Sequence, residues 1–242
     1  KNGNMSPEEA LEGMLSAGAD PNEYDREHEG WTPLTTAAFY GRHDAIEILL
    51  KHGASIDYPH EQGMTPLMMA VQQNDLDTME QLLYHGADVA KGNHENQTAL
   101  FLAAQEGKVD AMRVLIDHHS PVSTPSIQGT TPLLVAAQYH QLDAIELLLG
   151  SGASVDEANV AGLTALHVVA QTGNMTAMRY LLKKRFRLDA RDRDHNHIIQ
   201  RAAACGHIPM VNALLNMGVK INDVNGNQVT PFASAAGHRQ IE

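Results

Sequence analysis

The sequence has few cysteines, few aromatic side chains and few basic ones. Its single cysteine, Cys205, excludes a framework of internal disulfides, so cysteine usage does not indicate the redox compartment. One Trp and four Phe are too few to form a core. Such a core must be built mainly from Leu, Ala, Val, Ile and Met, which suits thin helical layers better than a globule packed around rings.

Long apolar runs and a positive net charge are also missing. No run approaches the roughly 20 apolar residues needed to cross a bilayer, which excludes a membrane span of that kind. The net charge of −12 argues against nucleic acid as the main partner, because phosphate binding needs a basic face. Residues 179–242 alone are basic, and eight of the 17 Lys and Arg residues lie within 179–201. We interpret that basic segment as a solvated outer face.

The sequence does contain a strict internal repeat. The stretch beginning Trp31-Thr32-Pro33-Leu34 returns every 33 residues, and six of its seven copies keep the Thr. The seven anchor positions are Thr32, Thr65, Thr98, Thr131, Thr164, His197 and Thr230. A fixed period between 20 and 50 residues is typical of a stacked array of small units.

Other features recur in phase with the anchor. A Gly precedes it by two residues in four units, and Ala pairs follow it, as at Ala37-Ala38 and Ala136-Ala137. A Gly nine residues after the anchor marks a break, and an apolar pair such as Leu49-Leu50 comes before a Gly-Ala turn. From Ser6 to about Ala236 this pattern resembles the ankyrin repeat family, whose unit reads G-x-T-P-L-H-x-A-A-x-x-G-H and later L-L-x-x-G-A.

The resemblance implies an all-α repeat solenoid. About six helix-turn-helix units of 33 residues with β-hairpin fingers would be flanked by partial cap units. We expect one continuous domain, with an N-terminal capping half-repeat at 1–22, the ankyrin array at 23–229 and a truncated C-terminal repeat at 230–242. Ser6-Pro7-Glu8-Glu9 predicts the start of the capping helix, because Ser and Glu form a capping box around Pro.

Local chemistry predicts how each unit is built. The anchor Thr can cap the first helix, and the Pro that often follows has a suitable φ and no N–H to lose. His119 and Arg185 stand where a Gly usually adopts the left-handed conformation. Each must either accept a cost of about 1 kcal/mol or change the turn.

No catalytic or metal-binding pattern accompanies the repeat. The pairs His28-Glu29, His60-Glu61 and His94-Glu95 lack the second His that H-E-x-x-H requires. They share one place in the repeat and are interpreted as echoes of it. No phosphate loop and no nucleophile elbow are present. We therefore expect no enzyme activity, no metal and no cofactor.

The resemblance places partner binding on the concave side, on the finger tips and the exposed face of the first helices. The positions so assigned are Trp31, Phe39, Tyr40, Met64, Gln72, Gln73, Gln97, Gln105, Glu106, Gln138, Tyr139 and Leu163. Ile127 and Val160 extend the apolar line of the fingers. Trp31, Phe39, Tyr40 and Met64 would form an exposed hot spot. Alternatively, these side chains pack on one another and stiffen a first finger that is two residues longer than the rest.

We expect a monomeric protein-binding module that grips one folded protein, as a stoichiometric inhibitor or protective partner of an enzyme. An adaptor, or the regulatory ankyrin portion of a larger effector, enzyme or channel, is the alternative. Many cytosolic animal members of the family carry several cysteines, so the single Cys205 slightly favours a bacterial, exported protein.

Overall fold

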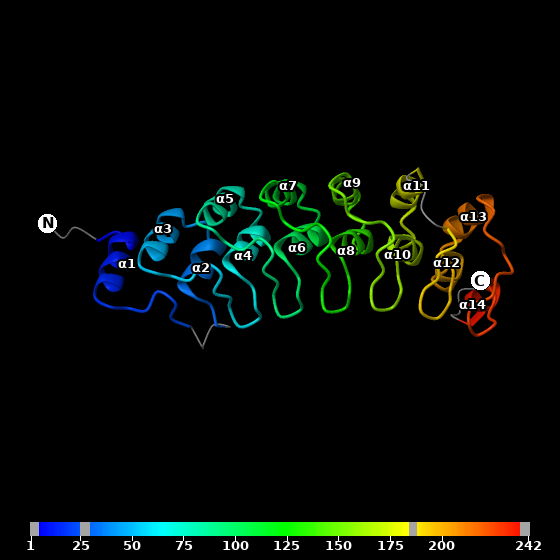
Figure 1. Ribbon diagram of the computed structural model, residues 1–242, viewed down its shortest axis with the longest axis horizontal. Coiled ribbons are helices and arrows are strands. Elements are labelled where there is room, and N and C mark those ends of the chain that lie inside the picture. Colours follow the sequence, from blue (N-terminus) through cyan, green and yellow to red (C-terminus); the bar gives the residue numbers. More distant parts are fainter. Residues whose placement is uncertain (1–4, 25–29, 184–187, 238–242) are drawn as a thin grey trace. The chain divides into compact units, whose positions relative to one another are not determined.

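The computed structural model describes residues 5–24, 30–183 and 188–237, and Figure 1 shows the fold. Positions 28, 29 and 185, on which sequence expectations were placed, lie outside these ranges. The chain divides into two compact units. Unit 1 comprises residues 1–103 and 108–124, and unit 2 comprises residues 104–107 and 125–242.

Each repeat contributes two antiparallel helices, which we call inner and outer in chain order. The inner helices are α2 (Pro33–Phe39), α4 (Pro66–Gln73), α6 (Ala99–Glu106), α8 (Pro132–Gln138), α10 (Ala165–Thr172), α12 (Ile198–Ala204) and α14 (Pro231–Gly237). The outer helices are α1 (Pro7–Ser16), α3 (His43–Lys51), α5 (Leu76–Tyr84), α7 (Val109–Asp117), α9 (Leu142–Gly150), α11 (Met175–Lys183) and α13 (Ile208–Asn216). None of these helices, within the described ranges, has the length and apolarity to span a membrane.

The predicted caps are confirmed. The Thr32 Oγ1 atom accepts a hydrogen bond from the Thr35 N–H at 3.1 Å, and Pro33 occupies the first turn of α2. In α1, Ser6 and Glu9 form the expected capping box. Where the sixth unit lacks the Thr, the His197 N–H donates to the Gln200 side chain at 2.7 Å, so the helix start is still satisfied.

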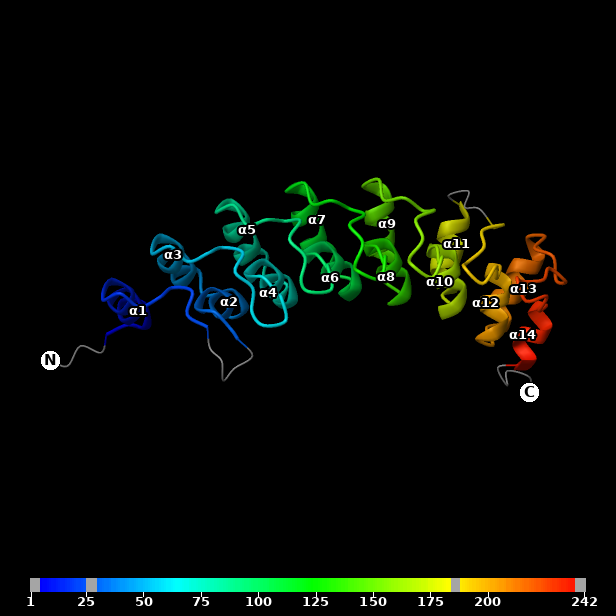
Figure 2. The ribbon, with the colours of Figure 1, turned by 60° about the horizontal axis from the view of Figure 1, so that its bottom comes forward.

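Apolar residues of the repeat form the core. The first Leu of each apolar pair is almost completely buried in six successive units, at Leu49, Leu82, Leu115, Leu148, Leu181 and Leu214. In unit 1, α2 packs on α4, and α1 packs on α3. In unit 2, α10 packs on α8 and α12, and α14 packs on α12. Figures 1 and 2 show inner and outer helices in separate rows within each unit.

The fingers are tight turns, and the described residues contain two isolated β-bridges in place of a ladder of strands. In the third unit, the Asn93 N–H donates to the Gln97 carbonyl at 3.0 Å and the Asn96 N–H to the Asn93 carbonyl at 2.9 Å. The Asn93 side chain also accepts from the Glu95 and Gln97 N–H groups. An Asx side chain thus supplies bonds that a longer hairpin would take from a ladder. His119 keeps the left-handed conformation, with φ of 65°.

Candidate partner-binding surface

An aromatic cluster joins the start and end of α2 to the following finger. The Trp31 ring stacks on His60 with centroids 5.9 Å apart and planes 11° apart. Phe39 meets Trp31 edge-on at 5.1 Å, and Tyr40 meets Phe39 edge-on at 5.2 Å. Such geometries are favourable for ring pairs. Trp31 and Phe39 are half-buried by these contacts, while Tyr40 is 63% exposed.

His60 is the buried member of the cluster. Its Nδ1 atom accepts a hydrogen bond from the Gln62 N–H at 2.9 Å, so this nitrogen carries no proton in that arrangement. A neutral imidazole therefore stacks on the indole. The mutual packing anticipated as the alternative describes Trp31 and Phe39, whereas Tyr40 leaves most of its ring in solvent.

Met64 does not lie on the surface as the sequence suggested. Its side chain is 6% exposed, and its Sδ atom lies 3.8 Å from the Asn93 Nδ2 atom of the next finger. The position before the anchor Thr is therefore covered in this unit, because the following finger closes over it. An exposed hot spot cannot include Met64.

The remaining assigned residues differ in exposure. In unit 1, Gln72 and Gln73 are exposed at the end of α4, whereas Gln97 is half-buried and accepts from Asn93 at 3.0 Å. In unit 2, Gln105 is half-buried, with its carbonyl bonded to Gln141 at 3.3 Å. The exposed set in unit 2 is Glu106, Gln138 and Tyr139 on the inner helices and Ile127 and Val160 on the fingers, with Leu163 half-buried.

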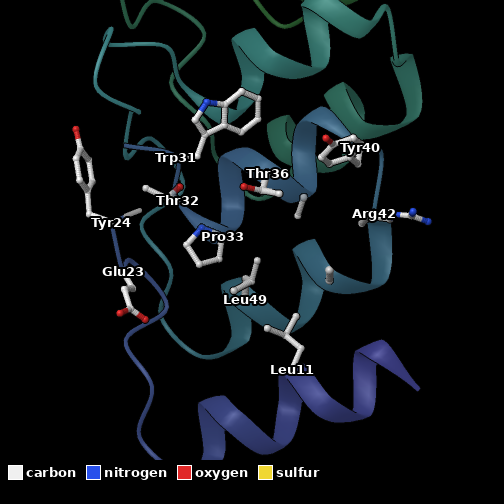
Figure 3. Close-up of a pocket in the computed structure, with 12 residues that line it drawn as sticks. Leu11, Glu23, Tyr24, Trp31, Thr32, Pro33, Thr36, Tyr40, Arg42 and Leu49 are labelled. Carbon is white, nitrogen blue, oxygen red and sulfur yellow. The ribbon is translucent and has the colours of Figure 1, made fainter. Parts of the chain in front are cut away.

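An open groove of about 1180 Å³ lies over α2 and was not anticipated from the sequence (Figure 3). We call it the α2 groove. Its residues come from α1, the first loop, α2 and α3, namely Leu11, Glu23, Tyr24, Trp31, Thr32, Pro33, Thr36, Ala37, Tyr40, Arg42, Ala45 and Leu49. All of them belong to unit 1.

Two Arg side chains of the basic segment make hydrogen bonds within the fold. The Arg201 Nε atom donates to Asp192 at 2.7 Å, and Asp192 also accepts from the Asn196 N–H at 2.8 Å. Burial alone would raise the pKa of Asp192, but the hydrogen bonds from Asn196 and Arg201 outweigh it and hold that pKa below its usual range. Arg191 bonds two backbone carbonyls, those of His195 and Val224.

Two buried histidines lie near this ion pair. His167 is fully buried, and its Nδ1 atom lies 2.9 Å from the Thr164 hydroxyl. Burial lowers the pKa of His167. Burial also lowers the pKa of His197, although the Asp223 carboxylate lies 3.7 Å away. No group of three or more His, Cys, Asp or Glu side chains in the described ranges is placed to hold a metal ion.

Comparisons with known proteins agree with the repeat architecture. The family profile described as ankyrin repeats in three copies matches residues 2–93, 90–159 and 151–225. No curated protein matches the sequence. Among solved structures, the chain is similar to the ankyrin repeat domain of Bcl-3, described as a unique member of the IkappaB protein family. That match has 24% identity and a TM-score of 0.75, and it covers 88% of this chain and 98% of that chain.

Proposed function

The chain belongs to the ankyrin repeat family, a fold that serves as a general module for protein–protein interaction, and we propose that it binds one folded partner through its fingers and inner helices. We propose further that the partner is an enzyme, which the chain restrains or protects as a stoichiometric complex. The binding surface is also proposed, because the comparisons identify the fold and no partner.

One observation carries the proposal. The ends of successive inner helices carry large polar or aromatic side chains that the scaffold leaves exposed, at Tyr40, Gln72, Gln73, Glu106, Gln138 and Tyr139. Exposed Tyr side chains have a large apolar body, few rotamers and a polar tip, which is why they are enriched at binding hot spots. Ile127 and Val160 add apolar side chains on two fingers of unit 2.

Trp31 and Phe39 have a supporting role in this proposal. Their packing on His60 and on each other sets the position of Tyr40, so replacing Trp31 disturbs the joint as well as any contact with a partner. Tyr139 gives a cleaner test, because it is the C-cap residue of α8 and is 49% exposed.

The test compares baits that differ at single tyrosines. Wild type, Tyr139→Ala and Tyr84→Ala are immobilised at moderate salt and exposed to extracts of the source cells. Tyr84 is the matched control, because it is a largely exposed tyrosine at the end of an outer helix. We expect Tyr139→Ala to weaken capture of the specific partner by about 30-fold, which corresponds to a hot spot of about 2 kcal/mol, with Tyr84→Ala unchanged.

Titrating the captured protein with this chain and measuring its activity then distinguishes an inhibitor from an adaptor. An enzyme whose activity falls linearly and ends at a one-to-one ratio supports the inhibitor. Full activity in the complex, together with recruitment of a further protein, favours the adaptor or regulatory alternative. Equal capture by all three baits would contradict the assigned surface.

A further inference from the structure

Asn225 closes the seventh finger, which we define as residues 225–229. Its Oδ1 atom accepts hydrogen bonds from the Asn227 N–H at 3.0 Å and from the Val229 N–H at 2.9 Å. Its own N–H donates to the Val229 carbonyl at 3.1 Å. The arrangement repeats the one described for Asn93 in the third unit. This finger leads into α14 (Figure 1).

The residue that follows Asn225 distinguishes it from Asn residues at the same place in other fingers. The corresponding residue of the fifth finger, Asn159, is followed by the β-branched Val160, whereas Asn225 is followed by Gly226. Glycine has no Cβ atom, so its backbone nitrogen can approach a side-chain carbon that a larger residue would shield. Asn is a thermally labile residue, and Asn followed by Gly is the pair most prone to lose its side-chain amide as ammonia. The other Asn–Gly pair of the sequence, at positions 2–3, lies outside the described residues.

We propose that Asn225 is a site of spontaneous deamidation, and that its contact with the sixth finger, residues 192–196, controls the rate. In this reaction the Gly226 nitrogen bonds to the Asn225 Cγ atom and gives up its proton, the Cγ–Nδ2 bond breaks, and ammonia leaves with that proton. The product is a five-membered succinimide ring, which water opens at either carbonyl carbon to give Asp or isoaspartate. One water molecule is consumed and one ammonia is released, with no change of oxidation state.

Hydrogen bonds to the sixth finger hold the reacting groups apart. The Gly226 N–H donates to the Asp194 carbonyl at 3.2 Å. The Asn225 Nδ2 atom donates to the Asn196 Oδ1 atom at 2.8 Å. Before the ring can form, the Gly226 N–H must leave its acceptor and the Asn225 amide must turn. The folded contact therefore slows the reaction.

Opening of the contact between the two fingers sets the observed rate. Deamidation is much slower than the opening and closing of a loop. The observed rate is therefore the rate of a free chain multiplied by the fraction of time that the fingers are apart. The reaction keeps a permanent record of that opening, because the released ammonia is lost to solvent.

The product weakens the contact that controlled its formation. After deamidation, a carboxylate replaces the amide that donated to Asn196. The Asn196 Nδ2 atom donates to the buried Asp192 carboxylate at 3.0 Å, so the new negative charge lies one amide group away from an existing one. Like charges repel at such short range. Isoaspartate also adds a methylene to the backbone of the finger.

Mass spectrometry of the tryptic peptide that begins at Ile221 tests the site, since trypsin cleaves after Lys220. The folded protein is incubated at neutral pH and physiological temperature beside the synthetic peptide 221–230, which gives the rate of a free chain. Fragmentation locates the modified residue and separates Asp from isoaspartate. We expect Asn225 to react in both samples, and at least about tenfold more slowly in the folded protein.

Three variants distinguish opening of the fingers from unfolding of the whole unit. Asn196→Ala removes the acceptor of the Asn225 side chain and should raise the rate several-fold. Ile145→Val weakens the core of unit 2 in a different repeat and should leave the rate unchanged. Asn222→Ala changes an exposed residue of the same loop and should also have no effect. Circular dichroism checks that each variant is folded.

Two further variants test the consequence of the reaction. Asn225→Asp copies one product, and Asn225→Ser introduces the residue that closes the fourth finger, Ser126, which cannot deamidate. We expect Asn225→Asp to unfold at a lower urea concentration than Asn225→Ser. A midpoint for Asn225→Asp equal to that of wild type would contradict the weakening.

Two outcomes would overturn the proposal as a whole. One is the same rate at Asn225 in the folded protein and in the free peptide, because the fingers would then offer no protection. The other is equal acceleration by Asn196→Ala and Ile145→Val, because unfolding of the whole unit would then control the reaction.

Discussion

Units 1 and 2 share one repeat and link its successive copies by different chemistry. In unit 1, a His just after the end of one outer helix bonds a Glu of the preceding outer helix, and three such His residues are spaced by 33 residues. The pairs are His52–Glu12 at 3.1 Å, His85–Glu47 at 2.9 Å and His118–Glu80 at 2.9 Å. We call these three His–Glu pairs the rungs of unit 1, and their Glu side chains are well exposed to solvent.

In unit 2, backbone hydrogen bonds link neighbouring fingers, and a buried ion pair lies within one repeat. The Val160 N–H donates to the Gln128 carbonyl at 3.1 Å, and the Arg193 N–H donates to the Ala161 carbonyl at 3.1 Å. The Asp192 carboxylate is buried beside Arg201 and helps to close its own finger. Water competes less for the Asp192 carboxylate because it is fully buried, whereas the two finger bonds join backbone groups of exposed residues.

The comparison shows that the repeat sequence alone does not determine how strongly its contacts stabilise each unit. Exposed pairs of this kind contribute about 0–1 kcal/mol each, and salt weakens them only where the His is protonated. Breaking a buried ion pair strands a charge and costs several times more. We therefore expect unit 1 to tolerate the loss of one His–Glu pair and unit 2 to be destabilised by the loss of Asp192.

The largest expected effect is that of Asp192→Ala. Removal of the buried carboxylate leaves the Arg201 guanidinium and the Asn196 N–H without their acceptor, so the free energy of unfolding of unit 2 should fall by roughly 3–5 kcal/mol. Urea unfolding followed by circular dichroism measures this loss. Trp31, the single Trp, lies in unit 1, and its fluorescence serves as the control. A loss of unfolding free energy below 1 kcal/mol would show that the Asp192–Arg201 pair is not essential to unit 2.

Gly162→Ala should have the next largest effect. Gly162 has φ of +76°, and a Cβ atom there would lie 2.7 Å from the Arg193 backbone nitrogen, which bonds the Ala161 carbonyl. Left-handed strain alone costs about 1–2 kcal/mol, and the clash adds to it by forcing the two fingers apart.

Gly150→Ala is the matched control in the same unit. Gly150 is the last residue of α9, and a Cβ there would meet nothing within 4 Å. Helix propensity predicts a gain of up to about 1 kcal/mol for this change. Equal midpoints for the two variants would contradict the finger contact.

The fold follows from the sequence because the signals for it are local and repeated. Thr caps, Pro at the first helical turn and Leu at fixed spacing define the helices in every unit, and the buried Leu148 and Leu181 lie where the period places them. A change of cap residue, as at His197, does not move the helix, since packing determines where it lies.

Exposure at the candidate site was harder to predict, because it depends on the neighbouring unit. Met64 has the same repeat position as Trp31, yet it is buried under Asn93 of the following finger. The α2 groove was not predicted either, because it depends on how α1, the first loop, α2 and α3 pack together. Likewise, the run of cations does not reveal that Arg201 pairs with Asp192.

Mild acid should lower the stability of unit 2, because His167 and His197 are buried there. Burial lowers both pKa values below the ordinary value of 6.5, so the folded state binds protons less readily than the unfolded state. Their stability is complete above pH 6.5 and is lost as pH falls through the folded values. Each can remove at most about 1.4 kcal/mol per pH unit.

Thermal melts between pH 7.5 and 5 measure this loss. The midpoint of the circular dichroism transition should fall as the pH falls. His167→Gln should reduce the pH slope. The low pKa of Asp192 adds a second loss only when the pH falls below the carboxylate range near 4. Equal pH slopes for wild type and His167→Gln down to pH 5 would contradict a special role for His167.

The smallest expected effect is that of His85→Gln, which removes one rung of unit 1. His85 bonds Glu47 at 2.9 Å, but Gln81 lies 3.4 Å from the same carboxylate, and the Glu47 side chain is well exposed. The substitution should lower the free energy of unfolding by at most about 1 kcal/mol at low salt and by no more than that in 1 M NaCl, because the pair is exposed. Urea titration followed by Trp31 fluorescence at both salt concentrations measures the difference. A loss of 3 kcal/mol that persists in high salt would show that the rungs of unit 1 behave as the buried joint of unit 2 does, and the contrast between the two units would then disappear.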